Sequence, residues 1–185
     1  MLYLMILSLT FLGCSCDNQN GSAGSGKSSP VGVREANANL PAMEGALTLM
    51  LSTEADSKGE TVCVKVSVND FQDIISMQYT LAWDPAVIRF NRIQSFGLPM
   101  FGQENFGTHL TQNGILTSVW IDMSLKGVNL SEGTTIYEVC FDLVGEPGTG
   151  TSIEFKQNPT PFEVVNAQEK LLELNGVPGA VNIQL

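Results

Sequence analysis

Residues 62–85 read VCVKVSVNDFQDIISMQYTLAWDP, and this stretch decides the fold class. Valine occupies every second position from Val62 to Val68, and a second run alternates large apolar with small or polar side chains from Met77 to Trp83. Alternation with a period of two is typical of β-strands that bury one face. The Asp-Pro step at the end stops the second run because proline has no N–H for a ladder.

The same alternation continues on both sides of this stretch and predicts nine strands. The Asn113-Gly114 step is a hairpin signal between the fifth and sixth strands. No long helical periodicity occurs, and only a short helical turn is expected near residues 168–171. Many short strands at regular spacing predict an all-β, antiparallel sandwich or barrel. The strands are expected at residues 47–52, 62–68, 76–83, 87–93, 106–112, 115–122, 135–144, 152–155 with 162–165 as one interrupted strand, and 180–185.

Composition excludes several functional classes. The chain has 185 residues, enough for one domain and a tail, and a formal net charge of −10, which does not suit a nucleic-acid backbone. Its single histidine, His109, excludes sites that need two imidazoles, and four cysteines with two near the N-terminus do not fit a zinc module. A triad needs a positioned base beside a nucleophile, so we expect no enzyme and no catalytic residue.

The first residues resemble an export signal. Residues 2–12 are apolar except for Ser8 and Thr10, a length that suits a signal-peptide core, and the Gly13-Cys14 step resembles a bacterial lipoprotein box. We therefore expect a signal peptide over residues 1–13, lipidation at Cys14, and an exported protein anchored by lipid to the cell envelope. The alternative is a buried N-terminal strand. Residues 14–44 are small and polar and are expected to form a flexible tether.

This tether contains a match to the phosphate-loop pattern. Gly21, Gly26, Lys27 and Ser28 occupy its fixed positions, but no strand precedes them and Pro30 follows where a helix would start. We therefore expect no nucleotide to bind.

Cys63 and Cys140 lie on the polar faces of two predicted strands. If these strands are antiparallel neighbours, both sulfurs emerge on one outer face, and an oxidising compartment favours a disulfide between them. The alternative is two free thiols.

Several segments resemble the cohesin domain of cellulosome scaffolds. These are Gly-Glu-Thr-Val at residues 59–62, Leu-Ala-Trp-Asp-Pro-Ala-Val-Ile-Arg-Phe at 81–90, the strand at 133–141 and the last strand at 176–183. The resemblance covers residues 45–185 and implies a nine-stranded antiparallel β-sandwich with jelly-roll topology. It also implies a partner: a dockerin, the calcium-stabilised helical module of polysaccharide-degrading enzymes.

In the family one outer sheet face binds the dockerin. Members usually carry Asn and Asp where this chain has Ser76 and Gln78, so the face loses a charge. Carried over position by position, the expected face is Ser76, Gln78, Thr80, Leu110, Thr117, Val119, Ile121 and Asp122.

The composition of this face is a separate argument for an interface. Thr117, Val119 and Ile121 would form an apolar stripe, with Gln78 and Asp122 at its rim, and exposed stripes of this kind often mark protein interfaces. The alternative is that a loop of the chain covers the stripe. The opposite parity of Trp120 places it in the core with Trp83.

Two other functions remain open from the sequence. A carbohydrate-binding module could recognise a polysaccharide through Phe96, Phe101 and Phe106, which could equally be loop anchors; a structural or adhesive envelope lipoprotein is the other. No cofactor is expected, although Asn69, Asp70 and Asp73 could contribute to a calcium site or form a solvated turn.

Overall fold

The computed structural model describes Met43 and residues 45–185, and in these residues every regular element is a β-strand or a short 3-10 turn. The predicted all-β class is confirmed. The turns are η1 (Gln103–Asn105) and η2 (Thr111–Asn113). The strands are β1 (Ala46–Leu51), β2 (Glu54–Asp56), β3 (Thr61–Asn69), β4 (Ile74–Ala82), β5 (Ile88–Gln94), β6 (Phe106–Gly107), β7 (Ile115–Ile121), β8 (Thr134–Leu143), β9 (Gly150–Lys156), β10 (Glu163–Asn166), β11 (Leu171–Val177) and β12 (Gly179–Ile183).

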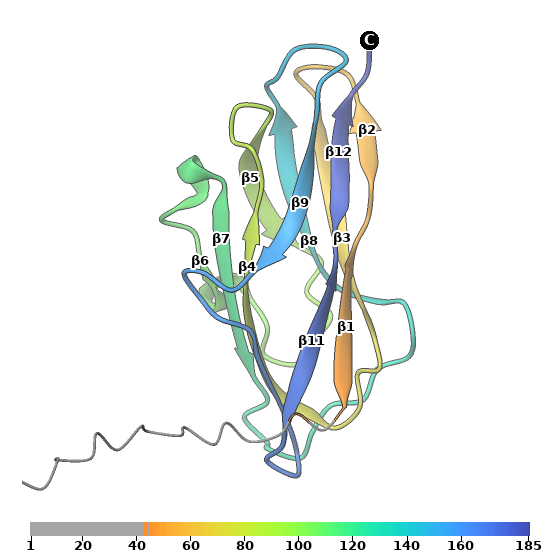
Figure 1. The fold of residues 1–185 in the computed structure, drawn as a ribbon, viewed down its shortest axis with the longest axis vertical. Helices are drawn as coiled ribbons and strands as arrows, with labels where there is room; N and C mark the ends of the chain where they lie inside the picture. Colours follow the sequence, from red (N-terminus) through yellow and green to blue (C-terminus); the bar gives the residue numbers. More distant parts are fainter. Residues whose placement is uncertain (1–42, 44) are drawn as a thin grey trace, which may run out of the picture. The chain divides into compact units, whose positions relative to one another are not determined.

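The strands form two layers that pack face to face (Figure 1). One layer has the order β5-β8-β3-β1-β11. In the other layer β4 is central: β7 pairs along one of its edges, and β10 and β9 share the other edge. The short strand β6 extends the layer beyond β7, and β12 and β2 extend it beyond β9. Because β11 pairs with both β1 and β10, the layers are joined at that edge.

The strand number and the purely antiparallel pairing differ from the prediction. Twelve strands are present among the described residues instead of nine, and two pairs, β1 with β11 and β2 with β12, are parallel. Strand β1 is followed along the chain by β2 in the other layer, and β11 is followed by β12 in the same way. The runs β1–β2 and β11–β12 lie side by side in the same direction (Figure 1), which makes their pairing parallel.

Three predicted segments are also corrected. The interrupted eighth strand is two separate strands, β9 and β10, which pair with different parts of β4. The expected helical turn near residues 168–171 is the tight connection between β10 and β11. The fifth strand, expected over residues 106–112, ends at Gly107, and the chain then turns through η2.

The alternating residues of the opening stretch fill the space between the layers. The four valines of β3 and the large side chains from Met77 to Trp83 are all buried, and Trp120 joins them as expected. The hydroxyls of Tyr79 and Tyr137, one from each layer, share a hydrogen bond of 2.9 Å at the centre. Burial raises the pKa of both hydroxyls well above the usual value, so both stay protonated.

Candidate docking face

The outer side of β7 presents an uncovered apolar stripe. Strand alternation turns Leu116, Ser118 and Trp120 into the core and Thr117, Val119 and Ile121 outward. Val119 is 42% exposed and Ile121 is 46% exposed, whereas Thr117 is half-buried. No loop of the described residues therefore covers the centre of the stripe.

Strand β4 lies beside this stripe in a register that pairs Ser76 with Ile121 and Gln78 with Val119. Ser76 and Gln78 are half-buried on the same face. Thr80 was expected there too, but it is completely buried. The loop before β10 covers it: the Thr80 hydroxyl donates to the Thr160 carbonyl and accepts from the Thr160 amide, both at 3.0 Å.

Strand β10 completes the face on the other side of β4. Glu163 stands opposite Gln78, and Val165 stands opposite Ser76. A shallow hollow of about 70 Å³ lies among these strands and is lined by Ser76, Met77, Gln78, Val119, Trp120, Ile121 and Glu163. The β10 residues are not among those predicted for the face, because the sequence pattern predicts residues 162–165 as the end of an interrupted strand.

Two loops extend the apolar surface. Met100, in the loop before η1, is 74% exposed and Met123, directly after β7, is 69% exposed. A second hollow of about 290 Å³ is lined by Met100, Glu104, Asn105, Val119, Ile121 and Met123. No sequence pattern marks Met100 and Met123 as part of the face, because their exposure depends on how the loops pack. We call the docking face the set Ser76, Gln78, Met100, Val119, Ile121, Met123, Glu163 and Val165.

The loop that carries Met100 is held against β7. Trp120 donates its indole N–H to the Pro99 carbonyl at 2.8 Å, and Asn105 donates to the Val119 carbonyl at 2.9 Å. Met100 and Leu125 both adopt positive φ, 51° and 54°, which is unfavourable for side chains of this size. These two apolar side chains are thus presented to solvent on strained backbone.

Asp122 does not lie on the rim of the face, as had been expected. It is only 6% exposed, and its carboxylate organises the turn after β7. It accepts hydrogen bonds from the amide and hydroxyl of Ser124, both at 2.9 Å, and from the Gly127 amide at 3.1 Å. The Ser124 donors hold the pKa of Asp122 below its usual value. Its role is to shape the turn that carries Met123 and Leu125.

Leu110 is also placed differently from the prediction. It precedes η2 and is half-buried in the turn between β6 and β7, because β6 ends at Gly107. The expected hairpin step at Asn113-Gly114 is instead the end of η2, where Gly114 adopts a φ of 73°. Leu110 therefore does not share the strand surface that Val119 and Ile121 occupy.

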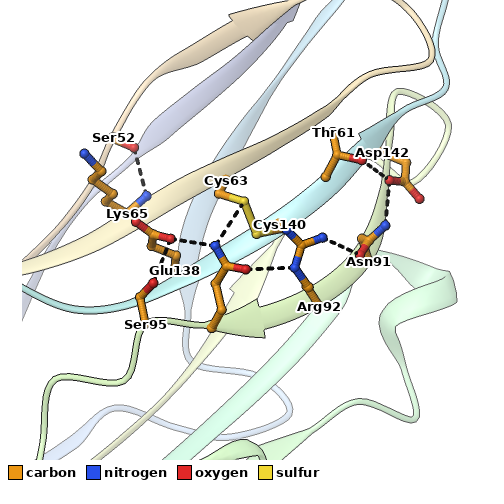
Figure 2. The surroundings of a disulfide bond; sticks show 11 residues. Ser52, Thr61, Cys63, Lys65, Asn91, Arg92, Ser95, Glu138, Cys140 and Asp142 are labelled. Atoms are coloured by element: carbon orange, nitrogen blue, oxygen red, sulfur yellow. Dashed lines mark hydrogen bonds between the residues drawn. A yellow bond between two sulfur atoms is a disulfide. The ribbon is translucent and has the colours of Figure 1, made fainter.

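Cys63 and Cys140 are joined by a disulfide between β3 and β8, on the outer side of the other layer (Figure 2). The Gln94 amide contacts the Cys63 sulfur at 3.7 Å and donates to Glu138 at 2.9 Å. This hydrogen bond, with a further one from Ser95, lowers the pKa of Glu138. Among these polar side chains Cys63 is half-buried and Cys140 is fully buried.

The three phenylalanines considered for glycan binding pack into the protein. Phe101 and Phe106 are buried with ring centroids 5.0 Å apart, and both contact the ring of Tyr137. Phe96 packs against both at about 6 Å. These rings are loop anchors and offer no flat platform for a sugar.

The acidic turn between β3 and β4 binds the neighbouring loop. Asn69 accepts from the Gly133 amide, the Asp70 amide donates to Glu132, and Asp73 and Asn129 exchange two hydrogen bonds. In the described part of the chain no group of three or more acidic, histidine or cysteine side chains could hold a metal ion. His109 is exposed, and the expected lipidation at Cys14 lies outside the described residues.

A comparison with protein-family models decides the family. Residues 47–183 match the model of the cohesin domain, which is most of the chain. The chain belongs to the cohesin family. Cohesin domains are non-catalytic binding modules, in agreement with the expectation that this protein is not an enzyme.

Solved cohesins share the fold at low sequence identity. The seventh ScaB type I cohesin from Pseudobacteroides cellulosolvens has a TM-score of 0.64 and 10% identity, covering 76% of this chain and 93% of that one. The OlpA cohesin of Clostridium thermocellum, solved in complex with the dockerin Doc918, has a TM-score of 0.63 and 12% identity over 75% and 99%. A non-cellulosomal cohesin from the archaeon Archaeoglobus fulgidus has a TM-score of 0.55 and 14% identity over 75% and 91%.

No curated protein matches this cohesin in sequence. Among the residues that the structure describes, none of the elements is a helix long and apolar enough to cross a membrane.

Proposed function

We propose that this cohesin captures a dockerin-type module through its docking face. The observation that carries the proposal is the exposed pair Val119 and Ile121, which lies uncovered on the outer side of β7 beside the central strand β4. Apolar side chains gathered in one patch and bordered by polar groups are characteristic of protein interfaces. Cohesins of the same fold have been solved with dockerins bound, which supports this partner class.

The charge of the docking face indicates what charge the contact surface of the partner should carry. Its ionisable residue is Glu163, Glu104 lies at its edge, and Ser76 and Gln78 between the strands are uncharged. The partner should therefore present apolar side chains with a basic residue near their edge, since opposite potentials favour association. A partner with an acidic contact surface would be repelled.

A pull-down with a panel of purified dockerins tests this proposal. We expect at least one dockerin to be retained by the full chain and lost when Val119→Asp and Ile121→Asp are combined. Val177→Asp provides a matched control, because Val177 is an equally exposed valine on β11. Retention of no dockerin, or equal retention by the double variant, would overturn the proposal.

We further propose that the captured protein is a polysaccharide-degrading enzyme and that Cys14 anchors the cohesin to the cell envelope. The apolar residues 2–12 followed by Gly13-Cys14 support export and lipidation, and the disulfide suits an oxidising compartment. Radiolabelled palmitate should enter the protein and be lost in Cys14→Ala. Unchanged labelling in this variant would refute the anchor, and capture only of dockerins from other kinds of protein would refute the enzyme partner.

A further inference from the structure

A hollow lies where the free edges of the two layers meet. Among the strands that the structure describes, β5 pairs only with β8 and β6 pairs only with β7, so each is the last strand of its layer at this edge. The hollow has a volume of about 530 Å³, within the range of about 300–1,000 Å³ that is common for ligand pockets. It is lined by Pro85, Arg89, Phe90, Thr111 and Gln112.

A second hollow of about 230 Å³ shares Phe90 with the first. The two hollows therefore follow one another along β5, with a half-buried aromatic ring between them. None of their residues belongs to the docking face. The second hollow is lined by Phe90, Asn91, Arg92, Ile93, Gln103 and Thr108.

Arg89 and Arg92 are the two arginines of the described residues, and both line these hollows. Neither forms an ion pair within the described residues, where the ion pairs are lysine–glutamate contacts. Asp142, the register partner of Arg89, instead accepts hydrogen bonds from Thr61 and Asn91 (Figure 2).

The two guanidinium groups differ in their hydrogen bonding. Arg92 donates to the side-chain oxygens of Gln94 and Asn91 at 2.8 and 3.1 Å. The Arg89 guanidinium has no hydrogen-bond partner within the described residues. Although the net charge of the protein is −10, the N–H donors of the Arg89 guanidinium at the first hollow have no partner within the described residues. A guanidinium can bind a carboxylate through two parallel hydrogen bonds.

The remaining groups at this edge suit a polyhydroxylated ring. The side-chain amides of Gln103 and Gln112 are exposed and unpaired within the described residues, so they can bond to hydroxyls. Phe90 is the register partner of Phe141, and the ring of Phe141 packs edge-on against Trp83 at 5.0 Å.

We propose that this edge binds an acidic saccharide, a chain that contains uronic acid units. The carboxylate of one unit binds Arg89, the apolar face of a pyranose ring stacks on Phe90, and ring hydroxyls bond to Gln103 and Gln112. Because the site is separate from the docking face, the cohesin would hold an acidic polysaccharide and its protein partner at the same time.

Calorimetric titration of the purified full chain with tetragalacturonate tests the proposal. We expect binding that weakens at least about tenfold in Arg89→Gln, the size of effect of losing a charge-assisted pair of hydrogen bonds. Arg89→Lys keeps the charge but loses the paired donors of the guanidinium, so its affinity for tetragalacturonate should lie between those of the wild type and Arg89→Gln. Phe90→Leu should weaken binding to a similar degree, with its melting temperature and dockerin capture measured in parallel to show that it folds. Lys156→Gln, which removes a cation on β9, is the control and should bind like the wild type.

Four outcomes would overturn the proposal. These are no binding of tetragalacturonate, equal affinity for the neutral cellotetraose, equal affinity for the peptide tetraglutamate, and an unchanged affinity in Arg89→Gln. No binding would show that the site does not exist. Equal affinity for cellotetraose would show that the ligand's carboxylate is not recognised, and equal affinity for tetraglutamate would show that the site does not prefer sugars. An unchanged affinity in Arg89→Gln would show that Arg89 does not bind the carboxylate.

Discussion

Truncation of the two central side chains of the docking face should weaken dockerin binding by a predictable amount. In Val119→Ala combined with Ile121→Ala, β7 keeps its backbone pairing with β4, and the inward side chains of β7 are unaffected. The change therefore removes apolar surface from the interface while the fold is preserved.

The magnitude follows from the exposed fractions. Complete burial of a Val or Ile side chain contributes about 1.5–3 kcal/mol, and 42% of Val119 and 46% of Ile121 remain to be buried, which gives about 0.6–1.3 and about 0.7–1.4 kcal/mol. If the two contributions add, the loss is about 1.3–2.7 kcal/mol, or a rise in Kd of about 10- to 100-fold.

Calorimetry with a dockerin retained in the pull-down measures this change. Val177→Ala is the matched control, because Val177 is 45% exposed on β11 and should leave the Kd unchanged. A rise of less than about threefold in the double variant, or an equal rise in Val177→Ala, would refute the assignment of β7 to the interface.

Three further predictions concern the stability of the fold. Replacing Cys63 and Cys140 by alanine should lower the free energy of unfolding by about 4 kcal/mol in the chain-entropy model, since the bridge closes a separation of 77 residues, and a loss below about 1 kcal/mol in urea unfolding would contradict this. Because the folded pKa of Asp122 is depressed, its stabilisation is present above the usual value of 3.8 and is lost as the pH falls through the folded pKa; acid unfolding should be less steep in Asp122→Asn, and identical pH profiles of the melting temperature would count against it. Gly114→Ala should destabilise by about 1–3 kcal/mol, because φ is 73° and the added Cβ would clash with the Trp83 carbonyl, so an unchanged melting temperature would show that the turn relaxes freely.

Strand alternation accounts for what the sequence could predict. The valines of β3 and the apolar residues of β7 face the side that a period of two assigns to them, because the pleat leaves each side chain only two directions. The same rule placed Val119 and Ile121 on the surface and Trp120 in the core. It also put the two cysteines on one outer face once β3 and β8 are neighbours.

The errors arise where burial depends on distant segments. Thr80 has the correct parity for the face, but the chain around Thr160 folds over it, and no local pattern reveals this contact. Asp122 has the inward parity of Trp120 and not the outward parity of Ile121, and β7 ends before it, so its carboxylate bonds within the turn instead of joining the rim of the face. Leu110 belongs to a run with a strand-like sequence, but β6 pairs with β7 at Phe106 and Gly107 and the chain then turns, so Leu110 is not part of a strand.

The loop residues of the face were missed because loops carry no periodicity. Met100 and Met123 become neighbours of Ile121 only when the loop before η1 packs on β7. Strand β11 is also absent from the predicted strands, for a different reason. Leu172 and Leu174 alternate inward, so the pattern was present, but it is too short to be decisive beside the turn that precedes it.

The most direct test of the central claim is a methyl NMR titration of the full chain with a bound dockerin. The docking-face account predicts that the methyl signals of Val119, Ile121, Met100 and Met123 shift or broaden together, while that of Val177 stays in place. Perturbation confined to methyl groups on the disulfide-bearing layer, with Val119 and Ile121 unchanged, would contradict it.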